Sequence, residues 1–239
     1  MKQRPHPIES AKQFTKKYFP NCTGALLSGS VVRGEETATS DLDMVIFEEG
    51  CKNSYRESLV DQGWPIELFV HNLSSYKEFF KSDVDRGRPS LPRMVAEGTI
   101  VKEHPFISAV KKEAEQLLVK GPEAWTKETI EVKRYFLTDA LDDFLGSTKR
   151  EEDLFIAPVL AELIIEFYLR TNQQWVGHSK WAIRALRQYD DKFADRIVEA
   201  FDTFYRMGDK RQVIAVADSV LEKYGGRLFA GYSMGKGES

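Results

Sequence analysis

Leu27-Ser28-Gly29-Ser30 is followed, after ten further residues, by Asp41-Leu42-Asp43-Met44-Val45-Ile46, and these two segments are the most informative about the fold. Apolar residues before the Gly-Ser pair and around the aspartates indicate two short strands joined by a polar loop. Side chains two residues apart on a strand point to the same face, so Asp41 and Asp43 project together. The residues between and after them point to the opposite face and can pack. The segment therefore predicts a sheet that carries two carboxylates on one face.

The paired aspartates point to a metal site. Two neighbouring carboxylates repel each other unless a cation lies between them, and Mg²⁺ prefers such hard oxygen ligands together with substrate phosphates. Two ions held there can stabilise both the attacking and the leaving oxygen of an in-line displacement. Most isolated Asp-x-Asp pairs are turn or surface acids. The hypothesis therefore depends on Asp41 and Asp43 occurring together with the Gly-Ser turn at this spacing.

The Gly-Ser turn has the features of a phosphate-binding loop. Gly29 lets the backbone turn tightly and approach a ligand closely, because it has no side chain. Ser30 is expected at the start of a short helix or nest, where backbone N–H groups bind phosphate. Arg33 follows one turn later and can reach the same phosphates with its planar guanidinium.

A third acid, Glu67, is the only charged residue of a strand expected over residues 65–70. Its apolar neighbours alternate with it, so Glu67 must face solvent or a site. If this strand pairs beside the strand of Asp41 and Asp43, Glu67 becomes a third metal ligand. Solvated strand acids are common, which is the alternative interpretation.

The remaining pattern predicts an α+β fold in which a small mixed sheet is followed by an all-helical bundle. Before Gly121 we expect helices over residues 8–18, 51–62, 74–80 and 106–119 and strands over residues 24–28, 42–47, 65–70 and 99–102. After Pro122 only helical periodicity is found, over residues 125–145, 153–169, 180–189, 192–207 and 211–224. We therefore expect a catalytic domain over residues 1–121 and a helical, substrate-binding domain over residues 122–239. The glycine-rich end from Gly225 is expected to be loosely ordered.

Charge and composition exclude several classes of protein. The chain up to Gly121 has 17 basic and 17 acidic residues, and the rest has 17 and 20, so no basic block suits a long nucleic acid. No apolar run is long enough to cross a membrane. The basic first residues are not followed by an apolar segment, as they would be in a signal peptide. Cys22 and Cys51 provide neither a disulfide framework nor a zinc site. We expect a cytoplasmic protein with no membrane partner.

The Gly-Ser…Asp-x-Asp pattern over residues 24–70 resembles the polymerase-beta-type nucleotidyltransferase superfamily. With a helical second half in a chain of this length, it is most similar to the antibiotic nucleotidyltransferases of the kanamycin type. The resemblance implies that Gly29, Ser30 and Arg33 bind a nucleoside triphosphate, for which ATP is expected. Ser40 is expected to take part in the same binding site. It also implies that Asp41, Asp43 and Glu67 are catalytic and hold two Mg²⁺ ions.

The implied reaction is transfer of a nucleotide, AMP if the donor is ATP, to a hydroxyl of a small molecule such as an aminoglycoside-like antibiotic, with release of pyrophosphate. Such an activity would confer antibiotic resistance. The resemblance further implies a general base on the first long helix of the second domain. Asp143 lies nearest to that place and Asp139 is next, although kanamycin-type enzymes use a longer glutamate. Those enzymes are dimers, so a homodimer is also implied.

Two alternatives remain open at this point. The acceptor could be a protein, as in the antitoxin-type members of the superfamily, but those are much shorter and lack a large helical domain. The fold could also serve only as a nucleotide-binding module, against which the five residues Gly29, Ser30, Asp41, Asp43 and Glu67 argue.

Overall fold

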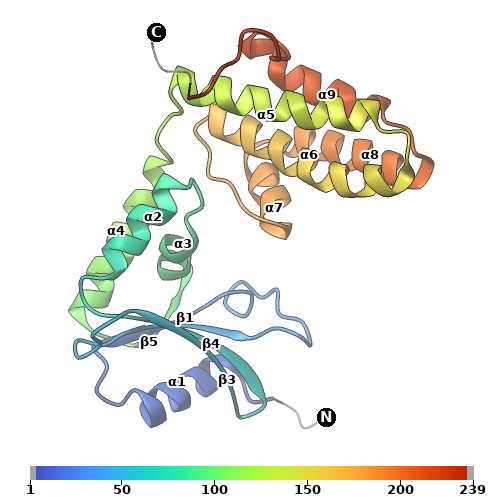
Figure 1. Ribbon diagram of the computed structural model, residues 1–239. Coiled ribbons are helices and arrows are strands. Elements are labelled where there is room, and N and C mark those ends of the chain that lie inside the picture. The colour runs from blue at the N-terminus through green and yellow to red at the C-terminus, as the bar shows by residue number, and fades with distance from the viewer. Residues whose placement is uncertain (1–3, 236–239) are drawn as a thin grey trace. The chain divides into compact units, whose positions relative to one another are not determined.

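The computed structural model describes residues 4–235 and divides into two compact units, one ending at Gly121 and one beginning at Pro122. The first unit combines a sheet with four helices (Figure 1). Its elements are α1 (Pro7–Tyr18), β1 (Gly24–Ser28), β2 (Leu42–Phe47), β3 (Tyr55–Asp61), β4 (Trp64–His71), α2 (Tyr76–Asp85), α3 (Ser90–Glu97), β5 (Thr99–Lys102) and α4 (Pro105–Lys120).

The five described strands form one mixed sheet in the order β3-β4-β2-β1-β5. β2 and β4 are parallel, and the other neighbouring pairs are antiparallel. Helix α1 covers one face of the sheet, while α2, α3 and α4 lie on the other (Figure 1). The α+β class and the mixed sheet predicted from the sequence are confirmed.

The alternation of residues along β2 explains the two layers. Leu42, Met44 and Ile46 are fully buried in the core under α1. Val45 and Phe47 are buried in the core on the opposite face, under α2, α3 and α4. Asp43 belongs to this second face by the period of two, and therefore lies where the helical cover stops.

Strand β3 corrects one prediction, because residues 51–62 were expected to form a helix. Tyr55–Asp61 pairs antiparallel with β4 in a hairpin whose loop is Gln62-Gly63. Both loop residues have positive φ, 51° and 79°, as a two-residue type I′ turn requires. β3 is an edge strand that is exposed along most of its length, so it lacks the alternating apolar pattern by which strands are recognised.

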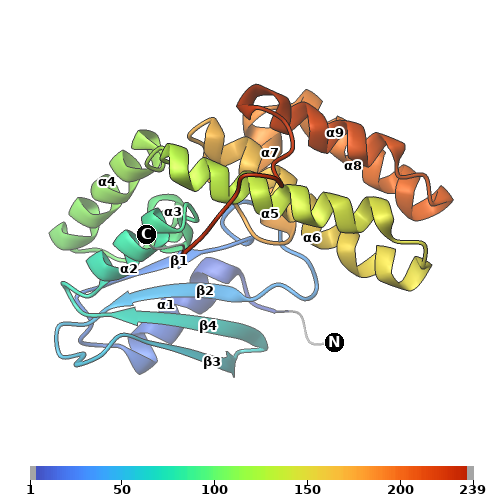
Figure 2. The same ribbon diagram turned by 45° about the horizontal axis from the view of Figure 1, so that its top comes forward.

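The second unit contains helices throughout and one short 3₁₀ turn (Figure 2). Each described helix packs against the next in sequence, and α9 also packs against α5 and α6. One apolar core is formed from all five helices, including Leu141, Phe144, Ile164 and Phe204. The elements are α5 (Lys127–Gly146), α6 (Arg150–Thr171), α7 (Lys180–Tyr189), α8 (Asp191–Met207), α9 (Arg211–Leu221) and η1 (Glu222–Tyr224).

The described part of the glycine-rich end is bound to α5, contrary to the expectation of a loose tail. Arg134 donates two hydrogen bonds to the carbonyl of Gly226, and the Leu228 N–H donates to the buried hydroxyl of Thr138. Tyr135 and Tyr232 stack with their ring centroids 4.0 Å apart. The tail after Gly235 lies outside the described residues.

Among the helices of residues 4–235, none combines the length and the apolar character needed to cross a bilayer.

Candidate active site

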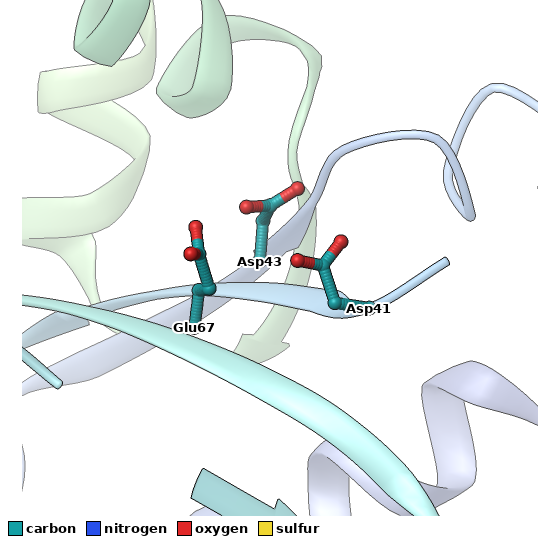
Figure 3. A group of neighbouring side chains, drawn as sticks. All are labelled: Asp41, Asp43 and Glu67. Atoms are coloured by element: carbon teal, nitrogen blue, oxygen red, sulfur yellow. The ribbon is translucent and has the colours of Figure 1, made fainter. Parts of the chain in front are cut away.

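Asp41, Asp43 and Glu67 come together at one end of the central strands (Figure 3). Asp43 and Glu67 are direct neighbours in the parallel register of β2 and β4, and Asp41 precedes β2 by one residue. One carboxylate oxygen from each residue lies within 4.8 Å of the other two. The three side chains project from the same side of the sheet (Figure 3).

The electrostatics of this acidic triad are unfavourable for three ionised carboxylates alone. The pKa of Asp43 is raised to about 6, mainly by burial and also by the neighbouring charges of Asp41 and Glu67, against the lowering effect of Arg33 and Arg56. A group of oxygen ligands that repel one another is stabilised by a bound divalent cation. The triad therefore has the ligand chemistry and the spacing to hold Mg²⁺.

Gly29 lies directly against the triad. Ser28 pairs with Asp43 across β1 and β2, so the turn after β1 begins beside that carboxylate. Gly29 has a φ of 83°, and a Cβ at this position would collide with the carboxylate of Asp43. The glycine is therefore required both for the left-handed backbone and for the close approach of the turn to the acid.

The residues after Gly29 form a hydrogen-bonded turn. The N–H groups of Val32 and Arg33 donate to the carbonyls of Gly29 and Ser30, at 3.3 and 3.2 Å. The Ser30 hydroxyl donates to the hydroxyl of Ser40 at 3.1 Å, which joins the two ends of the loop between β1 and β2. The structure thus brings Gly29, Ser30 and Ser40 to one place next to Asp41.

Arg33 also lies at this end of the sheet, where its charge lowers the pKa of Asp43. Its guanidinium is 3.1 Å from a carboxylate oxygen of Glu97 at the end of α3 and 3.3 Å from one of Glu35. Arg93, one turn earlier on α3, approaches the other oxygen of Glu97 at 3.9 Å. A triphosphate at this place would compete with Glu97 for Arg33.

Arg56 is the charged neighbour of the triad that sequence reasoning missed. Its Nη2 lies 2.7 and 2.6 Å from the two carboxylate oxygens of Glu67. The expected helix over residues 51–62 concealed it, because only the β3–β4 pairing puts Arg56 on the same face as Glu67. The sequence does contain a signal for this hairpin, because Gln62-Gly63 lies between two segments rich in strand-forming residues.

The predicted general base belongs to the second unit. Asp143 and Asp139 are both exposed on α5. Asp142, between them in the sequence, is exposed as well and lies 3.4 Å from Arg227. The catalytic role of Asp143 stays a prediction.

No protein-family model matches the chain, and no curated protein matches it significantly. A solved structure described as a nucleotidyltransferase-like protein from Exiguobacterium sibiricum 255-15 is similar to it, with a TM-score of 0.50 and 9% sequence identity. The similarity covers 90% of this chain and 74% of that protein. At this identity the likeness concerns the fold. The chain therefore has the fold of a nucleotidyltransferase-like protein: a mixed sheet carrying an acidic triad, followed by a helical region.

Proposed function

We propose that this protein is a magnesium-dependent nucleotidyltransferase that transfers AMP from ATP to a hydroxyl of a small molecule. The observation that carries the proposal is the triad of Asp41, Asp43 and Glu67 on two adjacent parallel strands, with the Gly29 turn against Asp43. A site of this kind combines ligands for a cation with a backbone turn that can approach phosphate.

The cation ligands would be Asp41, Asp43 and Glu67, for two Mg²⁺ ions. When bound, such ions supply Lewis-acid stabilisation of the attacking oxygen, the transferring phosphoryl group and the leaving pyrophosphate. Asp43 contributes fully only as the ionised carboxylate, and with a pKa of about 6 this form already predominates at neutral pH.

The triphosphate site is assigned to the turn. Gly29 lets the backbone of the turn lie directly against the Asp43 carboxylate, and the hydroxyls of Ser30 and Ser40 lie at the same place. Arg33 supplies positive charge and a planar set of donors, which suits phosphate better than a point charge. Binding would exchange the contact of Arg33 with Glu97 for contacts with the triphosphate.

The reaction joins the acceptor oxygen to the α-phosphorus of ATP while the bond from that phosphorus to the β-bridging oxygen breaks. The products are the adenylylated acceptor and pyrophosphate. The hydroxyl proton passes to a general base, a role that we assign to Asp143 and, in second place, to Asp139. Both are exposed carboxylates on α5.

The acceptor that we propose is an aminoglycoside-like antibiotic, following the resemblance to kanamycin-type enzymes. The acidic excess of the second unit, 20 acidic against 17 basic residues, favours a cationic acceptor over a nucleic acid. By the same resemblance, we propose that the protein is a homodimer, that it acts in the cytoplasm and that its activity confers antibiotic resistance.

The test is pyrophosphate release from ATP and Mg²⁺ with a panel of aminoglycosides, lincosamides and neutral sugars. Release is expected only with one acceptor class and is expected to disappear in Asp41→Asn. Glu57→Gln is the matched control, because Glu57 is an exposed acid of β3 on the opposite face from Glu67. Tight binding of ATP with no release for any acceptor would direct the search to a protein acceptor. Absence of ATP binding would refute the proposal.

A further inference from the structure

Arg56 places a permanent positive charge on one of the proposed metal ligands. One nitrogen of its guanidinium, Nη2, donates to both oxygens of Glu67, at 2.7 and 2.6 Å. The Glu67 side chain is 27% exposed and the Arg56 side chain 61% exposed. The ion pair therefore lies at the solvent edge of the triad, where Arg56 has room to leave.

The sheet explains why Arg56 reaches Glu67. In the β3–β4 hairpin, Ser58 is directly opposite Glu67 and Arg56 is directly opposite Phe69. Arg56 and Ser58 are two residues apart, so both point to the face that carries Glu67. The guanidinium carbon lies 5.0 Å from the ring centre of Phe69, which holds the side chain over the sheet and directs it toward Glu67.

Such a pairing has a direct consequence for cations. A divalent ion binds a carboxylate cluster according to the charge and the number of free oxygens that the ligands present. Arg56 reduces the net negative charge of the triad by one and occupies one hydrogen-bonding position on each oxygen of Glu67. A cation must therefore share Glu67 with Arg56 or displace it.

We propose that Arg56 is a positioning residue that competes with divalent cations for Glu67 and weakens cation binding until nucleotide is present. This inference rests on the proposed function and adds a control over metal loading. The phosphates of a bound triphosphate bring further oxygen ligands and negative charge, which favour the cation and compensate for Arg56. Divalent cations then bind to the triad in the nucleotide complex rather than in the free protein.

The test measures Mn²⁺ affinity of the full chain without nucleotide, from the electron paramagnetic resonance signal of free Mn²⁺ at pH 8. Arg56→Gln is expected to lower the dissociation constant about three- to tenfold, the size expected for one charge near a partly exposed site. Arg56→Lys keeps the charge and should stay closer to the unmodified protein. Arg206→Gln, which removes an exposed arginine paired with Asp202 on α8, is the control and should change nothing.

Two further measurements sharpen the result. The effect of Arg56→Gln should shrink at high salt, because exposed charges are screened. It should also shrink when a non-hydrolysable ATP analogue is bound. Equal or weaker Mn²⁺ binding by Arg56→Gln would overturn the inference while leaving the proposed function intact. If Asp41→Asn leaves Mn²⁺ binding unchanged, both in the unmodified protein and in Arg56→Gln, the inference and the proposed function are both overturned.

Discussion

The two units each carry a group of three acids, and the two groups differ in burial and in geometry. Asp41, Asp43 and Glu67 converge within 4.8 Å on a half-buried sheet face. Asp139, Asp142 and Asp143 follow one another along an exposed helix, where Asp142 has an ordinary ion pair with Arg227. The first group stores electrostatic repulsion that a cation can relieve, while the second is solvated. Burial and convergence, rather than acid content, thus distinguish a candidate catalytic site from a charged surface.

The largest effect should come from removing a carboxylate of the triad. Asp43→Asn is expected to lower the rate of nucleotide transfer by about a thousandfold or more, because loss of a metal ligand removes several kcal/mol of transition-state stabilisation. Asp142→Asn is the matched change in the helical group and should leave the rate nearly unchanged. Steady-state pyrophosphate release measures both. Comparable losses in the two variants would remove the distinction between the groups.

A smaller effect is expected from the proposed base in the helical group. Asp143→Asn should lower kcat about a hundredfold, while the KM for ATP stays the same. Asp139→Asn, one turn earlier on the same exposed face, is the comparison. If Asp139→Asn causes the larger loss, the base is Asp139. If neither change affects kcat, the acids of α5 are only a solvated surface.

Substitutions of two glycines can separate the effect on stability of the close contact between Gly29 and Asp43 from the effect of backbone strain. Gly29→Ala and Gly34→Ala both put a side chain at positive φ, 83° and 68°, but only the first would collide with a carboxylate. Strain should cost each variant about 1 kcal/mol in the free energy of unfolding, with about 1–3 kcal/mol more for Gly29→Ala. Urea denaturation measures the difference, and equal losses would contradict the close approach.

The smallest effect concerns stability of the metal-free protein. The pKa of Asp43 is about 6 in the folded state, against 3.8 for an unperturbed aspartate, so the folded state binds more protons between these values. The contribution of Asp43 to the free energy of unfolding should therefore fall as the pH rises from about 4 to about 6 and stay reduced above that. Burial of His71 lowers the pKa of that side chain to about 4, and its contribution has the opposite sign. The difference between the unmodified protein and Asp43→Asn isolates the Asp43 contribution. Asp43→Asn removes the charge and should stabilise the protein at pH 8 by about 1–2 kcal/mol, after allowance for partial exposure.

Urea titrations in a chelator at pH 4.5 and pH 8 test this expectation. The advantage of Asp43→Asn should be larger at pH 8 and should decline when Mg²⁺ is added, because the cation stabilises only the unmodified triad. Asp142→Asn should lose at most about 1 kcal/mol, as is typical of exposed ion pairs. An Asp43→Asn variant that is less stable at pH 8 would show that the triad is not under electrostatic repulsion.

Prediction from the sequence succeeded where the determining interactions are local. The alternation in β2 and the change to helical periodicity after Pro122 are properties of neighbouring residues, and both match the structure. Prediction failed at β3, where residues on both faces are exposed, so that no periodic pattern marks the strand. That error concealed Arg56, because its place beside Glu67 depends on the hairpin pairing.

Local sequence patterns are sufficient to predict which side chains share a face, since a strand has a period of two, and that the backbone can turn tightly at Gly29. The pairing of the strands in three dimensions determined that β4 lies parallel beside β2 with Glu67 next to Asp43. It also decided that Gly29 touches Asp43 and that Arg56 binds Glu67. The physical reason is that strand order and register result from packing between segments distant along the chain, and no local pattern encodes them.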